Sequence, residues 1–505
     1  MKILSSLNTF KLSILGLILL FSNLVDAQHP TEQWRPKVHF SPQKNWTNDP
    51  NGMIYFKGYY HLFFQHNPKG NEWGNMSWGH ARSKDLLHWE ELPVAIPNGK
   101  EYIFSGCVVW DKYHASGLGN PQKDLLIAIY TADYPYTREE QHLAFSNDDG
   151  LTWTKYEGNP VLNINYKDFR DPNIFWHEES KQFIMAVAKP FEYKISFYGS
   201  KNLIKWELLS EFGKQGDVGM IWECPSLQYL PIEGSTQKKW VLFVSSQGPY
   251  KDYVGMQYFI GDFDGKKFTN ENDEDTKLYV DFGKDFYAAV PFSNAPKNQN
   301  VWLGWMLSWK YAKEQPTFPW KGQMSLARKL SLVESNQGLR LQQKFVPDFD
   351  RMAPSFEASN FVVKDSKFKQ ISGMKFLKDK TYAVDVKISG SKSHFSGLLI
   401  KGKANEQEWI KIGFDEKTMK WKIDRSHSGK IISDFFDGLQ VAPAVDGMPK
   451  NFKVVIDRST VELLAQNGTV AISALRFPLD IEENVYLISE GGNTQIQQIK
   501  IWELK

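Results

Sequence analysis

The sequence contains few cysteines, no excess of either charge and no long apolar run beyond its amino terminus. Only Cys107 and Cys224 occur in 505 residues, which excludes the disulfide-dense scaffold of a small secreted domain. The formal net charge is +2, with Lys and Arg scattered among Asp and Glu. No basic field is therefore available to attract nucleic acid or an anionic membrane, and we expect a neutral partner.

The amino-terminal segment is typical of a signal peptide. Lys2 and Lys11 accompany an apolar run at residues 12–24, and Ala27 ends a small-residue cleavage motif. The run is shorter than the roughly 20 residues that span a bilayer, which disfavours a membrane anchor. We predict that residues 1–27 are removed and that the mature protein is exported to the periplasm, the cell surface or the medium, with no membrane span.

Sustained helical periodicity is absent from the rest of the chain. Short apolar runs such as residues 53–56, 60–64 and 125–130 alternate with Gly, Asn, Asp and Pro, which is typical of strands. Eighteen Trp and 21 Tyr are also present. Most of these rings are expected in the core of an all-β protein, although ring faces also suit the C–H surfaces of sugars.

A weak internal repeat divides the first part of the chain. Residues 83–89, 146–153 and 200–206 each begin with Ser-x-Asp or Ser-x-Asn and end in Trp, and these Trp lie 64 and 53 residues apart. This spacing fits a four-stranded blade of a β-propeller. The three turns are therefore expected to end equivalent strands.

A second series runs in step with the first. Its members are spaced by 56, 66, 52 and 62 residues and are Asp49, Ser105, Asp171, Glu223 and Asp285. If each marks the innermost strand of one blade, a five-bladed β-propeller fills residues 36–338 and all five side chains face one channel. The two cysteines then lie on different blades, so we expect no disulfide between them.

The remaining chain has a different texture. Residues 342–347 resemble a connector, and residues 350–505 alternate apolar and polar positions over many short strands. This pattern predicts a C-terminal β-sandwich with an accessory role.

Three acids of the series carry a candidate chemistry. Hydrolysis of a glycosidic bond with retention needs two carboxyl groups about 5 to 5.5 Å apart, one as nucleophile and one as general acid and base. Asp49 lies in a polar turn whose hydrogen-bond donors should keep it ionised, as a nucleophile requires. Glu223 lies between Trp222 and Cys224, where desolvation and neighbouring acids should favour its protonated form.

Asp171 could stabilise the positive charge of the transition state, with Arg170 orienting it. Taken singly, Asn-Asp-Pro-Asn-Gly is also an ordinary turn and Arg-Asp-Pro an ordinary ion pair; the common phase of the acids favours catalysis. His177-Glu178 lacks the second histidine of a zincin motif, because Lys181 stands in its place. We predict no metal site and no cofactor.

Together these segments resemble glycoside hydrolase family 32, the fructan hydrolases that include invertases, inulinases and levanases. The resemblance covers nearly the whole mature chain and rests on residues 46–52, 63–65, 73–74, 104–106, 169–172, 222–225, 285–288, 316–320, 325–328 and 457–462. It implies a five-bladed propeller followed by a sandwich, retention of configuration and no cofactor.

The resemblance also implies residue roles. It makes Asp49 the nucleophile, Asp171 the transition-state stabiliser and Glu223 the acid and base. The residues that would hold the terminal fructosyl unit are Asn48, Gln65, Trp73, Phe104, Ser105, Arg170 and Trp320.

Thr47 and Ala327 depart from the commonest family pattern without touching the acids, and Thr47 alters the pocket wall, which leaves the exact substrate open. Overall likeness to bacterial levanases favours levan, with internal cleavage as one mode. Exo-acting inulinase or invertase activity is the near alternative. An arabinofuranose-acting hydrolase, a fructan-making transferase and a non-catalytic glycan-binding propeller stay open, although the last should have lost one acid. We expect a monomer.

Overall fold

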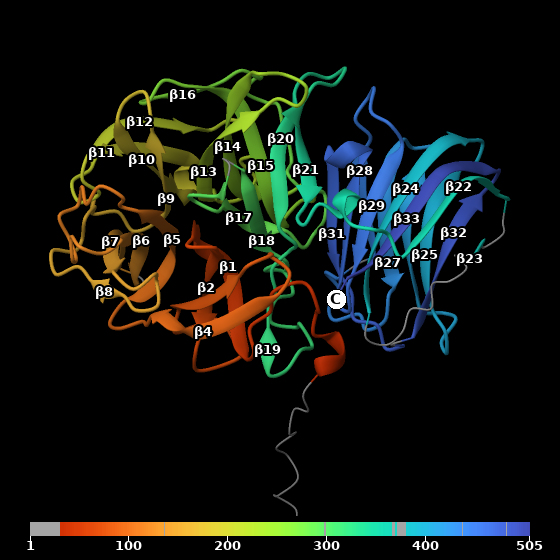
Figure 1. Cartoon of the computed structure of the whole chain (residues 1–505), viewed down its shortest axis with the longest axis horizontal. Coiled ribbons are helices and arrows are strands. Elements are labelled where there is room, and N and C mark those ends of the chain that lie inside the picture. The colour runs from red at the N-terminus through yellow and green to blue at the C-terminus, as the bar shows by residue number, and fades with distance from the viewer. Residues whose placement is uncertain are drawn as a thin grey trace, which may run out of the picture.

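Two all-β regions lie side by side in the computed structural model of the protein (Figure 1). The structure describes residues 31–504 except 136, 297–298, 366–368, 371–379, 437 and 481. The predicted signal peptide lies outside the described residues. Short 3-10 helices occur at η1 (Glu32–Trp34), η2 (Pro190–Glu192), η4 (Phe349–Arg351) and η5 (Gln466–Gly468). Within the described ranges, none of the helices has the length and apolar character needed to cross a membrane.

Five sheets make up the first region, each ordered here by strand adjacency. The first sheet contains β19 (Trp320–Lys321), β1 (Asn45–Phe56), β2 (Tyr59–Asn67), β3 (Ser77–Ser83) and β4 (Trp89–Ile96). The second contains β5 (Tyr102–Trp110), β6 (Leu126–Tyr134), β7 (Arg138–Ser146) and β8 (Thr154–Lys155). The third contains β9 (Arg170–His177), β10 (Gln182–Lys189), β11 (Lys194–Ser200) and β12 (Glu207–Gly213).

The other two sheets follow the same plan. The fourth contains β13 (Glu223–Pro231), β14 (Lys238–Gln247), β15 (Val254–Phe263) and β16 (Phe268–Asn270). The fifth contains β17 (Tyr287–Pro291), β18 (Val301–Trp305), β20 (Arg328–Val333) and β21 (Arg340–Phe345). Strands β1, β5, β9, β13 and β17 pack against one another in a closed ring. The region is therefore the predicted five-bladed propeller.

The repeated Ser turns occupy equivalent places in three blades. Ser83, Ser146 and Ser200 end the third strands β3, β7 and β11. In the first and third blades the Ser Oγ accepts a hydrogen bond from the backbone N–H of Leu86 at 2.8 Å and of Leu203 at 2.9 Å. The prediction that these turns end equivalent strands is confirmed.

Every innermost strand pairs irregularly with the second strand of its blade at the position of the acid series. The register shifts between residues 47 and 50 of β1, 103 and 106 of β5, 223 and 226 of β13, and 287 and 290 of β17, and between Ala186 and Ala188 opposite β9. Such bulges turn side chains out of the regular alternation. They direct these positions toward one end of the channel.

The last blade extends past the predicted boundary at residue 338. Residues 340–345 form its outermost strand β21, although residues 342–347 read as a connector. The polar side chains that suggested a loop are buried in hydrogen bonds: Gln343 Nε2 donates to Val280 O at 2.7 Å, and Ser331 Oγ donates to Gln342 Oε1 at 3.0 Å. Burial with partners lets glutamines occupy a strand.

The second region consists of two six-stranded sheets. One contains β22 (Phe356–Val363), β33 (Thr494–Leu504), β24 (Thr381–Ser391), β29 (Asn451–Ile456), β30 (Thr460–Ala465) and β31 (Val470–Leu475). The other contains β23 (Lys369–Gln370), β32 (Glu483–Glu490), β25 (Phe395–Gly402), β26 (Trp409–Asp415), β27 (Lys420–His427) and β28 (Leu439–Pro443). One apolar core joins the two sheets. The region is the predicted β-sandwich.

Asp285 joins the two regions and does not face the channel, contrary to prediction. It is fully buried, forms an ion pair with Arg425 at 2.5 Å and accepts a hydrogen bond from Leu475 N at 2.9 Å. Both partners belong to the sandwich. The blade interval identified the correct segment, but Asp285 precedes β17, and the channel position of this blade is Tyr287.

Candidate active site

A cavity of about 470 Å³ opens where the innermost strands begin. It brings together the three predicted acids and six of the seven predicted substrate contacts; its lining consists of Asn48, Asp49, Gln65, Trp73, Phe104, Ser105, Arg170, Asp171, Met220, Ile221, Glu223, Val254, Tyr287 and Trp309. All five blades contribute, so residues far apart in sequence meet at one place. Trp320 is not among them.

Asp49 is held by side chains from three blades. Its carboxylate accepts hydrogen bonds from Ser105 Oγ at 2.8 Å and Asn48 Nδ2 at 3.1 Å, and Cys224 Sγ lies 3.6 Å away. Asn48 is itself fixed by Trp46 Nε1, which donates to its Oδ1 at 2.7 Å. The donors predicted for Asp49 are therefore present.

Burial and neighbouring charge also influence the ionisation of Asp49, in addition to these donors. Burial raises the pKa of Asp49 above its usual 3.8, and the charge of Glu223 adds to this, while Ser105 and Asn48 oppose it. The predicted donors thus act against a larger effect of burial, and the ionised state of Asp49 as a nucleophile stays a prediction.

The turn after Asp49 depends on a glycine. Asn51 Nδ2 donates to the Asp49 carbonyl at 2.7 Å. Gly52 has φ of +49°, and a Cβ there would lie 2.8 Å from the Trp78 ring and 2.9 Å from Phe63. Only glycine meets both the backbone conformation and the close packing.

Asp171 lies beside Asp49 in a strained position. Its φ is +66°, unusual for a residue with a side chain. Its N–H donates to Thr131 Oγ1 at 3.0 Å, and its Oδ2 accepts from Cys224 N at 3.0 Å. Burial and the charge of Glu223 raise the pKa of Asp171 well above its usual value. Such strain and desolvation are typical of functional sites.

Glu223 is gripped from two sides. Arg170 Nε donates to its Oε1 at 2.9 Å, and the hydroxyl of Tyr287 donates to its Oε2 at 2.6 Å. Tyr287 is almost fully buried and was missed in the sequence, where the blade interval pointed to Asp285. Two donors of this kind fix the orientation of the carboxyl group.

Arg170 is shared with a fourth acid, Glu139, which the sequence did not reveal. Arg170 Nη1 donates to Glu139 Oε1 at 2.9 Å, and Phe169 N donates to Glu139 Oε2 at 2.6 Å. Burial raises the pKa of Glu139 to about 7, although Arg170 opposes the shift. Glu139 lies on β7, behind the cavity wall, so it acts on the site through Arg170.

Two exposed tryptophans stand at the cavity. Trp73 and Trp309 are 43% and 40% exposed. Trp309 stacks on Trp46 with ring centroids 5.8 Å apart, and Trp73 meets Phe104 edge-on at 6.2 Å. Rings supported in this way present rigid apolar faces that suit the C–H surfaces of a sugar. Trp309 was not predicted from the sequence.

The prediction that Trp320 contacts substrate is wrong. Its side chain is fully buried on β19, and the Arg35 guanidinium covers its ring at 5.0 Å from the centroid. Strand β19 pairs in parallel with the start of β1, joining Asn45 to Trp320. Trp320 therefore supports the strand that carries Asp49 and does not line the cavity.

The two cysteines are free and buried. Cys107 lies on β5 and Cys224 on β13, so the prediction that they do not pair is confirmed. Across the described ranges, no group of three or more His, Cys, Asp or Glu side chains is arranged to hold a metal ion.

Comparison with known proteins agrees with this geometry. Residues 39–344 match the N-terminal domain of glycosyl hydrolases family 32, and residues 354–503 match the C-terminal domain of the same family. The chain belongs to glycosyl hydrolase family 32. It is a glycoside hydrolase of the fructofuranosidase type.

The related proteins of family 32 include a levanase, exo-inulinases and invertases. A levanase of Bacillus subtilis is 40% identical over 96% of this chain and 72% of its own length. An extracellular exo-inulinase of Aspergillus niger is 36% identical over 95% of this chain and 96% of its own. The crystal structure of an exo-inulinase from Aspergillus awamori superposes with a TM-score of 0.87 at 34% identity, covering 94% of this chain and 99% of that one.

Proposed function

We propose that the protein hydrolyses β-fructofuranosyl linkages of fructans with retention of configuration. The observation that carries the proposal is the convergence of Asp49, Asp171 and Glu223 in one cavity, with Cys224 in contact with both aspartates. A carboxylate pair beside a third, strained acid suits an oxocarbenium-like transition state.

In the proposed reaction Asp49 attacks the anomeric carbon and forms a fructosyl ester. Glu223 gives its proton to the leaving oxygen, and then takes a proton from the water that attacks the ester. Asp171 would hydrogen-bond ring hydroxyls and stabilise the developing positive charge. Because the pKa of Asp49 is raised, the acidic limb of kcat/KM should lie above pH 3.8.

Six neighbouring side chains would hold the fructosyl unit. Asn48, Ser105 and Gln65 offer polar groups on the cavity floor, where they are 4%, 6% and 2% exposed. Arg170 would hold Glu223 and ring hydroxyls, while Trp73 and Phe104 would form an apolar wall. We add Trp309 and Tyr287 to this set, because both line the same cavity.

Levan is the substrate that we favour, and we propose attack at chain ends. The 40% identity to a levanase supports levan, while an exo-inulinase and an invertase are 36% and 34% identical to this chain. Asn48, Ser105 and Gln65, which lie beside the reacting acids, are nearly buried. A chain end therefore fits this cavity more readily than the middle of a polymer. The extracellular relatives and the amino-terminal segment support export of the mature protein.

The product profile on levan, inulin and sucrose tests this proposal. Fructose as the only early product from levan is expected for chain-end attack, whereas early oligosaccharides would show internal cleavage. Faster release from inulin or sucrose would replace levan as the preferred substrate. Absence of hydrolysis on all three, from a folded protein, would reject the function.

A further inference from the structure

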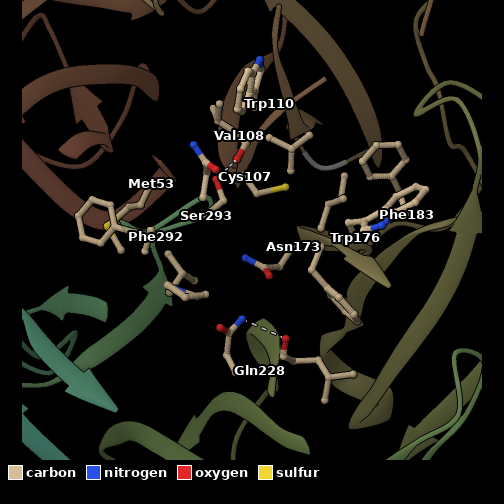
Figure 2. A pocket seen from close by; sticks show the side chains of 18 of the residues that line it. Met53, Cys107, Val108, Trp110, Asn173, Trp176, Phe183, Gln228, Phe292 and Ser293 are labelled. Atoms are coloured by element: carbon tan, nitrogen blue, oxygen red, sulfur yellow. Dashed lines mark hydrogen bonds between the residues drawn. The ribbon is translucent and has the colours of Figure 1, made fainter. Parts of the chain in front are cut away.

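A second cavity of about 820 Å³ opens at the other end of the propeller channel (Figure 2). The acids lie at the starts of the innermost strands, whereas this cavity is lined by their later residues, such as Met53, Trp110, Asn173, Tyr229 and Pro291. Each strand residue advances about 3.3 Å. The two cavities therefore face opposite sides of the propeller.

Aromatic rings surround this second cavity, and several are exposed. Trp176 is 43% exposed and meets Phe183 edge-on at 5.0 Å. Tyr229 is 46% exposed and stacks on Trp240 at 4.9 Å with the planes only 28° apart. Each exposed ring is thus held in place by a second ring, and the Lys238 ammonium lies over the Tyr229 ring at 5.5 Å from its centroid, where a ligand that stacks on Tyr229 would displace it. Large exposed aromatics at a concave site mark binding.

Two amide groups point into the middle of the cavity. Figure 2 shows Asn173 and Gln228 projecting from β9 and β13 toward one another. Asn173 is 7% exposed, and its side-chain amide forms no hydrogen bond with the described parts of the chain, although its backbone pairs with β10. Gln228 Nε2 donates only to the carbonyl of its neighbour Leu227, at 3.0 Å. A nearly buried amide with no partner is ready for a polar ligand group.

The cavity lining carries three lysines and two acids, and two of the lysines, Lys112 and Lys238, lie over aromatic rings. Its charged lining residues are Asp111, Lys112, Glu178, Lys201 and Lys238. Glu178 is paired with Lys181, and Asp111 accepts backbone hydrogen bonds from Ala115 and Ser116. Such a lining favours a ligand that is neutral, rich in hydroxyl groups and apolar on one face, which describes a sugar.

We propose that this cavity is a second, non-catalytic site that binds fructosyl units of the polysaccharide substrate. Trp176 and Tyr229 stack on sugar faces, and Asn173 and Gln228 hydrogen-bond hydroxyls. The identity of the sugar rests on the proposed function. A polymer held here raises the effective concentration of chain ends near the enzyme, as in any linked pair of sites.

Affinity electrophoresis in gels containing levan tests the site. The parent is the full mature chain with Glu223→Gln, which leaves the polymer intact, and sucrose is added to occupy the catalytic cavity. Trp176→Ala and Tyr229→Ala, singly and combined, should each weaken retardation by levan, with a loss of about fivefold or more in the double variant. Leu208→Ala, an exposed residue of β12 outside the cavity, is the matched control and should change nothing.

The same substitutions in the active enzyme separate this site from the catalytic one. Sucrose hydrolysis should keep its kcat/KM within about twofold, while the apparent KM for levan rises. Trp176→Phe, which keeps a ring against Phe183, should restore part of the retardation if folding limits Trp176→Ala. Unchanged retardation of the double variant, or no retardation of the parent, would overturn the site. Neither result bears on whether wild type hydrolyses levan.

Discussion

Two clusters of buried charge differ in how their charges are matched. In the catalytic cavity, Asp49, Asp171 and Glu223 have one nearby cation, Arg170, which also serves Glu139. Between propeller and sandwich, each acid of the interdomain network of His39, Asp281, Arg328, Asp457 and Glu462 has a cationic partner, with three acids sharing two cations.

The pKa directions follow the same division. Burial raises the pKa of Asp49 and Asp171. Burial also opposes ionisation of Glu462, yet Arg328 and His39 lower its pKa to about 2. The larger excess of carboxylates lies where chemistry needs poised groups, whereas the acids that each have a cationic partner lie at a joint that needs stability.

The largest effect is expected at the catalytic acid. Glu223→Gln keeps the shape of the side chain but has no carboxyl group to donate or accept a proton, so kcat on levan should fall by about 10² to 10⁴. Circular dichroism and thermal melting should stay close to wild type. Near-normal kcat in a folded Glu223→Gln variant would contradict the assignment of this residue.

In the interdomain network, a substitution should lower stability and leave catalysis unchanged. Arg328→Met leaves Asp281 buried without a cation and Glu462 with His39 alone, and such a break costs about 3–5 kcal/mol of unfolding free energy. Denaturant unfolding measures the loss. In the folded fraction, kcat on sucrose should be retained, and a selective loss of kcat without destabilisation would show that the network serves catalysis instead.

The network also predicts a pH window of stability. Burial lowers the pKa of His39, but its bonds to Asp457 and Glu462 outweigh this and raise it to about 9 from 6.5. That stabilisation is complete below pH 6.5 and is lost as pH rises through about 9. Glu462 contributes fully above pH 4.5, and its contribution is lost as pH falls toward about 2.

The Tm, measured across this range, should therefore be highest between about pH 4.5 and 6.5. His39→Gln should flatten the alkaline decline. A decline of the same steepness in His39→Gln would assign the alkaline sensitivity to other groups.

Glu139 lies behind the catalytic cavity and is paired with Arg170, so it is expected to act on the reaction through Arg170. Glu139→Gln should lower kcat/KM about tenfold, the effect of losing roughly 1.4 kcal/mol of positioning. The pH profile of kcat/KM should also change near pH 7, because a group with a pKa of about 7 is removed. Glu140→Gln, on the same strand, is the control; equal effects would point to a general change in β7.

The smallest effect concerns stability at the active site. Because Asp171 is buried among like charges, Asp171→Asn should raise the unfolding free energy by about 1 kcal/mol at neutral pH while it slows the reaction. The raised pKa means that this gain should vanish at acidic pH, where Asp171 is protonated in both states. A destabilised Asp171→Asn variant would show that its bond from Cys224 outweighs repulsion.

Strand patterns and the spacing between blades predicted much of the fold and of the candidate site from the sequence. Blade length brought Asp49, Asp171 and Glu223 to one cavity correctly, because each lies within the first five residues of an innermost strand. The interval was less accurate at the fifth blade, where a shift of two residues exchanged Asp285 for Tyr287. Nothing local distinguishes an acid that faces the channel from one that pairs with Arg425, which lies 140 residues away.

The missed residues share that cause. Glu139 matters through a contact with Arg170 on the next blade, and Trp309 lies on a long segment between β18 and β19. Trp320 was misplaced because an aromatic in a family motif can support a strand as well as a ligand. These contacts depend on the closed ring of blades, which no single segment encodes.

The parallel pairing of β19 with β1 has a consequence for synthesis of the chain. The strand carrying Asp49, the proposed nucleophile, leaves the ribosome early, but its edge partner Trp320 and the wall residue Trp309 emerge only with the fifth blade. Until then the first two residues of β1, Asn45 and Trp46, lack their edge partner and can pair with other strands. The nascent enzyme should therefore become active late and all at once, and truncated chains ending before residue 320 should need chaperones to stay unaggregated.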